Sequence, residues 1–284
     1  MRRLFCLVLA VMFVLPDQAA LAAPLPPEIV QALTDYGNNN ESSAIRRLQV
    51  MAEEDPNDYH ARWLLLRFTA LDLDNQDASQ LGSIDEEVRA VIQMAIDDGN
   101  PEYAHYIKSN YARNHRAYEI AISEIDSAIE IDPDSVFFHW VKATLLVRVG
   151  GWKKDNELIL EGIEIYKKAH LLGGDAHPAY YTEVDYHFNT AYALGRLING
   201  KNCPSTAIDH YLAVAELSEE QNTTVAYAWN NVSCAYRKAG LCAEAKAASE
   251  NALEIMDFGA ARRSLEYSEL CLQMQKIGLW DEAG

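Results

Sequence analysis

The sequence predicts an all-α protein built as a stack of helix–turn–helix units, that is, a helical solenoid. Three observations predict this fold. Apolar residues recur at helical spacing over nearly the whole chain. Glycine and proline fall mainly at the joints between helical segments. One arrangement of small and large residues returns about every 34 residues, and units of this kind bury their apolar faces on their neighbours.

The chain begins with the features of an export signal. Arg2 and Arg3 precede an apolar run of twelve residues, 4–15, and small residues follow up to a predicted cleavage site after Ala22. Together they predict a signal peptide over 1–22. The alternative is an uncleaved membrane anchor, but a helix needs roughly 20 apolar residues to span a bilayer. No later segment reaches that length, so we expect an exported protein, periplasmic or secreted.

The mature part, 23–284, divides into about six helix pairs and a closing half unit. In chain order the pairs are 28–56, 59–100, 101–135, 136–169, 183–215 and 226–256, followed by a lone helix over 264–277. The second pair is degenerate, because Leu66 takes a position for a small residue and a polar loop, 72–83, interrupts the pattern. In the fourth pair the second helix, 155–171, runs about one turn long, and the fifth pair has an enlarged turn at 199–204.

The clearest unit is 226–256, where each residue type has a physical reason. Ser233 and Ala245 are small where the two helices should cross, so the backbones can approach closely. Gly240 should end the first helix in a conformation that a side chain disfavours. The remaining positions hold residues that fill the space between layers or let the next unit dock: Trp229, Val232, Tyr236, Ser249 and Ala252.

With these residues in these places, the unit resembles a tetratricopeptide repeat and lacks only the closing proline of that pattern. The resemblance extends over nearly all of the mature chain. It implies a right-handed superhelix of antiparallel helix hairpins, whose first helices line a concave groove. It also implies a protein that acts by binding another protein. The alternatives on fold are another helical solenoid or a plain helical bundle.

The resemblance further implies which side chains face the groove. The expected groove residues are Tyr103, Tyr106, Asn110, Arg113, Trp140, Thr144, Tyr186, Tyr227, Asn230 and Arg237. Aromatic rings offer large contact areas, asparagine pairs with a peptide backbone in both directions, and arginine holds a carboxylate through two hydrogen bonds. Tyr106, Asn110 and Arg113 are expected to be exposed. The alternative is that the aromatic residues, Phe137 and Trp140 above all, only pack between layers.

Four cysteines remain after removal of the signal peptide: Cys203, Cys234, Cys242 and Cys271. An exported chain with an even number of cysteines can form disulfides. On the repeat register, Cys203 and Cys242 occupy similar heights in adjacent layers, and so do Cys234 and Cys271. These two pairs are therefore the predicted disulfides. A bond between Cys234 and Cys242 is the first alternative, and four buried free thiols acting as packing residues are the second.

The residues give no sign of catalysis. No motif of a metalloprotease, nucleotide-binding loop or serine hydrolase occurs, and we predict no cofactor, no metal and no catalytic residue. The one cluster of potential metal ligands, in 175–187, has no recognised spacing. A formal net charge of −18 argues against nucleic acid as a partner. We expect a non-enzymatic scaffold that binds a peptide or helix of another protein. The alternatives are a structural subunit of a cell-envelope or secretion assembly and an accessory chain of a separate catalytic subunit.

Overall fold

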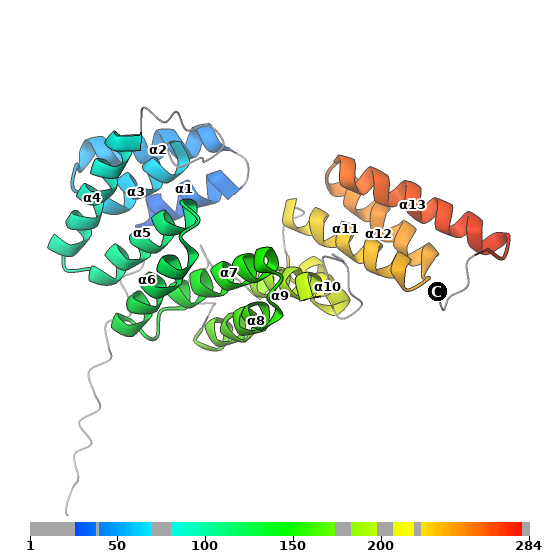
Figure 1. The fold of residues 1–284 in the computed structure, drawn as a ribbon. Helices are drawn as coiled ribbons and strands as arrows, with labels where there is room; N and C mark the ends of the chain where they lie inside the picture. The colour runs from blue at the N-terminus through cyan, green and yellow to red at the C-terminus, as the bar shows by residue number, and fades with distance from the viewer. Residues whose placement is uncertain are drawn as a thin grey trace, which may run out of the picture.

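The structure is a computed structural model of the chain, and it describes residues 26–37, 40–69, 81–173, 183–197, 207–218 and 223–279. These residues form thirteen α-helices (Figure 1): α1 Pro27–Gly37, α2 Glu41–Glu54, α3 Tyr59–Thr69, α4 Leu81–Asp97, α5 Pro101–Asn114, α6 Tyr118–Ile131, α7 Val136–Lys153, α8 Asn156–Leu171, α9 Glu183–Leu197, α10 Ile208–Leu217, α11 Thr223–Lys238, α12 Cys242–Ile255 and α13 Gly259–Lys276.

The helices stack as a solenoid, which confirms the predicted all-α repeat fold. Each helix packs on the next one in the chain, from α1 to α13. Figure 1 shows the stack running from α1–α4 at one end, through α5–α10, to α11–α13 at the other. No strand occurs in the described ranges. Contacts are made mainly between neighbours in the sequence, as a solenoid requires.

Helix ends follow local chemistry. The Asp155 side chain accepts hydrogen bonds from the backbone N–H groups of Glu157 (3.0 Å) and Leu158 (3.3 Å), so it caps α8. Ser135 caps α7 in the same way through the Phe138 N–H group (3.3 Å). After α11, Gly240 has a φ of 77°, the left-handed conformation in which a residue without Cβ is favoured. The prediction that Gly240 ends this helix is confirmed.

Small residues lie where paired helices cross, as the sequence predicts for Ser233 and Ala245. Ser109, Ala143, Ser233 and Ala245 are all almost fully buried. The Ser109 hydroxyl of α5 donates to the backbone oxygen of Ala121 on α6 at 2.7 Å. That distance brings one helix directly against the backbone of the other, which a large side chain at position 109 would prevent.

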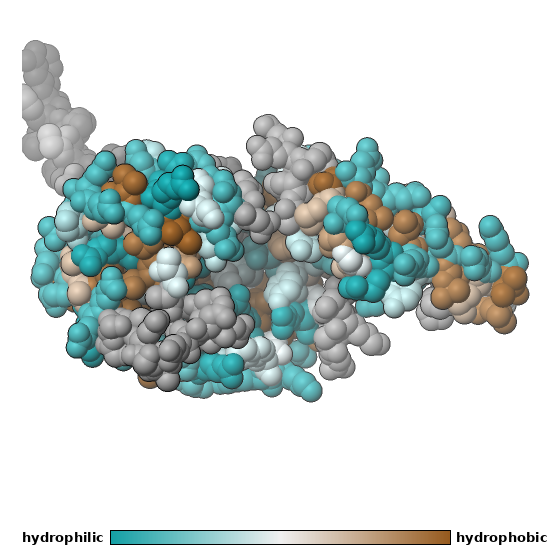
Figure 2. All heavy atoms as spheres, turned by 90° about the horizontal axis from the view of Figure 1, so that it is seen from above, coloured by the Kyte–Doolittle hydropathy of each residue, from teal (hydrophilic) through white to brown (hydrophobic). Residues whose placement is uncertain are grey.

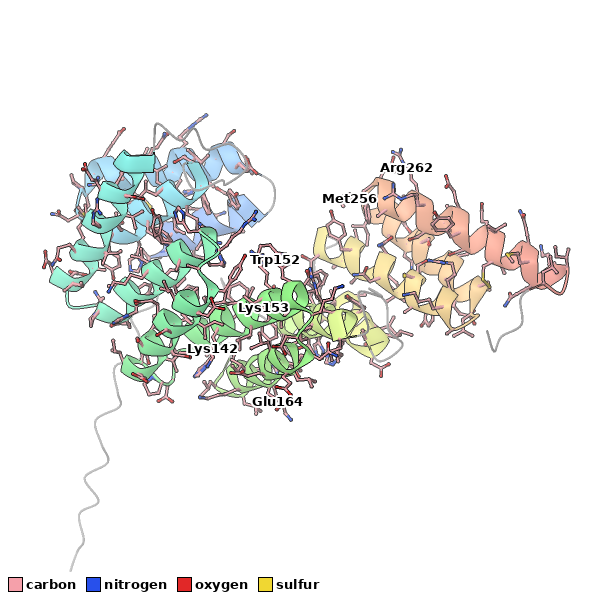
Figure 3. The ribbon with its side chains drawn as sticks, viewed as in Figure 1. Lys142, Trp152, Lys153, Glu164, Met256 and Arg262 are labelled. Atoms are coloured by element: carbon pink, nitrogen blue, oxygen red, sulfur yellow. A yellow bond between two sulfur atoms is a disulfide. The ribbon has the colours of Figure 1, made fainter. Side chains whose placement is uncertain are left out.

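Helix α7 joins the N-terminal part of the stack, α1–α6, to the part that follows it, α8–α13. Lys142 of α7 forms ion pairs with Asp126 of α6 (2.7 Å) and Glu161 of α8 (3.7 Å). Near the end of the helix, where Figure 3 labels Trp152 and Lys153, Gly151 faces α9. A Cβ atom on Gly151 would lie 2.7 Å from the Nη1 atom of Arg196. The absence of a side chain at this position therefore leaves room for the Arg196 side chain where α7 contacts a helix two places further on.

Some predictions fall outside the described residues. They are the signal peptide (1–22), the turn at 199–204, Cys203 and the first part of the 175–187 cluster. Among the helices that the structure describes, none is both long and apolar enough to cross a membrane.

Candidate functional site

One pocket, with a volume of about 250 Å³, opens among four helices of the N-terminal part. The helices are α1, α3, α5 and α7, each of them the first helix of its pair (Figure 1). The lining residues are Ile29, Leu33, Tyr59, His60, Trp63, Leu64, Arg67, Tyr103, Tyr106, Ile107, Asn110, Arg113, Phe137, Trp140, Val141, Thr144 and Arg148. The pocket thus lies on the helices that the sequence assigned to a groove.

An aromatic cluster forms one end of the pocket. The ring centroids of Tyr59 and Tyr103 are 6.0 Å apart, and those of Tyr103 and Phe137 are 6.4 Å apart. Tyr106 lies edge-on to Phe137 at 4.9 Å. The cluster connects α3, α5 and α7 near the N-terminal ends of these helices. Such rings offer an apolar surface to a ligand as well as support to the fold.

Three arginines line the pocket further along the same helices. Arg67 lies one helical turn after Trp63 on α3, Arg113 one turn after Asn110 on α5, and Arg148 one turn after Thr144 on α7. Burial, together with the charges of Arg67 and Arg148, lowers the pKa of Arg113 to about 10. Arg113 stays protonated at neutral pH, so three positive charges face one small volume.

Several buried hydrogen-bond donors at the pocket have no partner among the described residues. They are the indole N–H groups of Trp63 and Trp140 and the Nε–H group of Arg113. Buried polar groups normally find a partner in the protein, a water molecule or a ligand. These three donors are enclosed by the side chains around the pocket and have no partner there.

His60 contributes a polar but uncharged edge to the aromatic end. Burial lowers the pKa of His60 to about 4, so the ring is neutral at physiological pH. It lies edge-on to Tyr103, with ring centroids 4.6 Å apart. The positive charge of the pocket therefore comes from the arginines alone.

Six of the ten predicted groove residues meet at this pocket: Tyr103, Tyr106, Asn110, Arg113, Trp140 and Thr144. The expectation that Tyr106 and Asn110 are exposed is wrong, since they are 5% and 3% exposed. Tyr106 is covered by neighbouring rings, and the Asn110 amide donates to the Tyr106 backbone oxygen at 3.2 Å. Arg113 is half-buried. Thr144 is held by the Tyr166 hydroxyl at 2.9 Å.

The seventh predicted residue, Tyr186, belongs to a different cluster. Its ring stacks on His170 of α8, with centroids 4.5 Å apart and planes nearly parallel. It also lies edge-on to His187 and His210. The Nδ1 atoms of His187 and His210 are 2.8 Å apart, so one ring donates to the other. No group of three or more potential metal ligands occurs in the described part of the chain.

The last three predicted residues lie on α11 and pack against α13 or the residue that precedes it. Tyr227 lies edge-on to Phe258 at 5.0 Å, the Asn230 side chain accepts from Ser264 at 2.8 Å, and Arg237 lies over the Tyr267 ring at 5.3 Å. Helix α13 thus occupies the side of α11 that the register assigned to a groove, and none of the three lines the pocket.

Sequence reasoning missed four pocket residues that matter: His60, Trp63, Arg67 and Arg148. The first three lie in the degenerate second unit, where no register could be assigned. Arg148 falls one position after the expected groove position on α7. One signal could have found the two arginines. Each lies four residues after another pocket residue, in the pairs Trp63–Arg67 and Thr144–Arg148.

The disulfide pairing differs from the prediction. Cys242 bonds to Cys271, with Cα atoms 5.6 Å apart, so the expected pairs Cys203–Cys242 and Cys234–Cys271 are wrong. Cys234–Cys242 is also excluded, and Cys234 is itself disulfide-bonded, so the four cysteines are not all free. The register compared cysteines at equal heights in adjacent layers, Cys203 with Cys242 at the start of second helices and Cys234 with Cys271 on first helices. Helix α13 instead packs on α12, and its late residues lie beside the beginning of α12, as the hydrogen bond from Gln275 to the Gly240 oxygen (2.6 Å) shows.

Comparison with known proteins supports the fold and nothing finer. No family model and no curated protein sequence matches the chain. Among solved structures, yeast Tom70 is similar over 88% of this chain and 54% of its own, with a TM-score of 0.54 and 14% identity. The P58(IPK) TPR domain matches 88% of this chain and 66% of its own at 17% identity, but its TM-score of 0.36 carries no argument. The chain spans about half the length of Tom70.

Proposed function

We propose that this protein is a non-enzymatic scaffold that binds a segment of another protein in the pocket formed by α1, α3, α5 and α7. The observation that carries the proposal is the pocket itself. It combines an aromatic end and three arginines on α3, α5 and α7 with apolar side chains of α1. Hydrophobic surface with a few well-placed polar groups is the usual composition of a binding site.

A net charge of −18 supports a protein partner over nucleic acid, because a phosphate backbone is repelled by such a surface. The positive charge at the pocket is local and is enclosed by aromatic residues. It fits a few acceptor groups and offers no extended track for a polyanion.

We further propose that the protein works outside the cytoplasm, in the periplasm or as a secreted protein. Two features support this location. Residues 1–22 have the pattern of a signal peptide, and the Cys242–Cys271 disulfide is of the kind that persists in oxidising compartments. Mass spectrometry of the protein from its native host should find a mature N-terminus at Ala23. An N-terminus at Met1 on the isolated protein would contradict the proposal.

A photo-crosslinking residue in the pocket tests the binding proposal. We expect p-benzoylphenylalanine in place of Val141, which lines the pocket, to crosslink a partner in intact cells. The matched control places the same residue at Leu160 on α8, which is 51% exposed and lies outside the pocket. Crosslinks from position 160 but not from position 141 would contradict pocket binding.

Crosslinks from position 160 alone would favour the other candidate function, a structural subunit of a cell-envelope or secretion assembly. One observation favours it. Apolar surface lies along α13 and just beyond it (Figure 2), where Tyr267, Leu270, Ile277 and Leu279 are each at least half exposed. Large exposed apolar patches mark interaction surfaces. Two surfaces on one chain are compatible with a scaffold that has more than one partner.

A further inference from the structure

We infer that the pocket selects an acidic side chain, Asp or Glu, that stands next to an apolar or aromatic residue within a segment of the partner protein. The inference rests on the proposed function and gives the chemistry of the bound segment. The observation behind it is the convergence of Arg67, Arg113 and Arg148 on one pocket that also presents an aromatic end.

The three arginines lack the carboxylate partners that some arginines elsewhere in the protein have. Arg47 pairs with Asp35, Arg62 with Glu87 and Arg262 with Asp257. Within the described residues, no carboxylate lies in ion-pair distance of any of the three pocket arginines. The chain carries 42 acidic and 24 basic residues. Because acidic side chains are in such excess, three neighbouring arginines without an acidic partner are unexpected.

The like charges make an anionic ligand favourable. Arg113 is half-buried, and among the described residues its side chain makes one long hydrogen bond, to the Asn114 amide oxygen (3.5 Å). A carboxylate between the guanidinium groups would relieve the repulsion from Arg67 and Arg148 that contributes to the lowered pKa of Arg113. Arginine binds carboxylates through such charge-assisted, often bidentate, hydrogen bonds.

The two ends of the pocket differ in charge. At the aromatic end, the charges of Asp98, Glu102 and Asp58 add to the effect of burial and raise the pKa of Tyr59. No acidic side chain acts in this way on Arg113, whose pKa is lowered by burial and by its arginine neighbours. A bound acidic side chain is therefore attracted to the arginines and repelled from the aromatic end.

The aromatic end explains why the acidic residue needs an apolar neighbour. The cluster of Tyr59, Tyr103, Tyr106 and Phe137 borders the pocket, and an apolar side chain placed there would leave water. A volume of about 250 Å³ admits a few side chains. A short stretch of a segment, with one acidic and one apolar side chain, fits this size and this distribution of charge.

The test is an unbiased selection from a library of displayed peptides. The full mature protein is used as bait, in parallel with the Arg67→Gln/Arg148→Gln variant. The matched control is Arg62→Gln/Arg262→Gln, which removes two arginines outside the pocket, the first partly buried and the second exposed. We expect peptides selected by the wild type to be enriched in Asp or Glu beside an aromatic or aliphatic residue. The control should retain this enrichment and the pocket variant should lose it.

Synthetic peptides from the selection then identify the group that is bound. With both termini capped, changing the acidic residue to its amide (Glu to Gln or Asp to Asn) should weaken binding roughly tenfold or more, because hydrogen bonds to charged groups are strong. This comparison alters only the peptide, so it holds even if the arginine variant folds poorly. Loss of binding on C-terminal amidation alone would overturn the inference, since a terminal carboxylate would then be the ligand.

The remaining outcomes separate the inference from the proposed function. Pocket-dependent peptides without acidic enrichment would overturn the inference and leave the proposed function standing. Peptides whose binding is unaffected by a bulky Val141→Trp substitution in the pocket would overturn both. Dimerisation of the protein that the Arg67→Gln/Arg148→Gln variant abolishes would also overturn the inference, because a second copy of this chain would be the occupant.

Discussion

The two ends of the solenoid differ in what fills the space between their helices. In α1–α7 one continuous core contains large side chains such as Trp63 and Phe138. In α11–α13 the helices meet through Ser233, Ser249 and Ser268, with hydroxyl oxygens 2.6 and 3.4 Å apart, and through the Cys242–Cys271 bond. Small residues let helices approach closely, whereas the large aromatic residues of the first part surround a pocket. One repeat fold thus provides a binding site at one end and a closely packed, cross-linked end at the other.

The largest expected effect lies in the aromatic part. Phe138 is 1% exposed and packs edge-on to Tyr103 at 5.5 Å. Phe138→Ala should lower the free energy of unfolding by about 3–5 kcal/mol, because it removes contacts and leaves a cavity. Denaturant unfolding measures the loss, and hydrogen exchange should locate it in α5–α8. The control Tyr227→Ala removes a ring that is 42% exposed and should lose much less. Equal losses would contradict the contrast between the two parts.

The next effect lies at the cross-linked end. The disulfide closes a loop with a sequence separation of 29 residues, and restricting the unfolded chain over such a length contributes roughly 3–4 kcal/mol. Cys242→Ala/Cys271→Ala should therefore lower stability and speed hydrogen exchange in α12 and α13, while α1–α7 remain protected. Exchange that rises uniformly along the chain would show that the two parts unfold as one unit.

Acidification should weaken the protein through its buried histidines. Burial lowers the pKa values of His60, His187 and His210, that of His60 to about 4. The unfolded chain then binds protons below pH 6.5 that the folded chain does not, so stability is full above that pH and falls below it. His60 alone accounts for about 2 kcal/mol between pH 7 and pH 5. Carboxylates with lowered pKa values, such as Asp257, become protonated and lose their contribution to stability only at lower pH.

The melting temperature at pH 7 and at pH 5 measures this effect. His60→Gln should remove much of the difference, whereas His105→Gln, a change of a histidine that is paired with Glu124, should not remove it. Protonation would also place two positive charges on the His187–His210 contact, so hydrogen exchange at pH 5 should rise in α9 and α10. A melting temperature that is constant from pH 7 to pH 5 would contradict the assignment of neutral, buried rings.

The smallest expected effect is the most informative about function. Arg113→Met removes one of three like charges and keeps an unbranched apolar stem, so we expect stability to change by less than about 0.5 kcal/mol or to rise slightly. Binding of an acidic peptide should nevertheless weaken strongly. Thermal unfolding and peptide titration of the same variant give both numbers. A large loss of stability would show that Arg113 supports the fold and is not held ready for a ligand.

Much of the fold could be predicted because repeat folds depend on local patterns. The predicted long second helix of the fourth pair, 155–171, is α8, and the turn at Gly240 lies where the sequence places it. The site could be predicted only in part. Asn110 occupies a groove position, but burial depends on the rings packed around it, which a register does not contain. Arg67 was missed because its unit lacks the pattern, and the pairing of Cys271 was wrong because it depends on how α13 docks.

The contact between Gly151 and Arg196 has a consequence for the shape of the whole molecule. In a stack of rigid units, the angle between two neighbours is carried through every unit beyond them. Because the Arg196 side chain of α9 lies against Gly151, a methyl group there would first displace that side chain, whereas a large side chain at position 151 would tilt all the units that follow. The pocket, which lies before this joint, would keep its form, while the distance from it to the apolar surface of α13 would change.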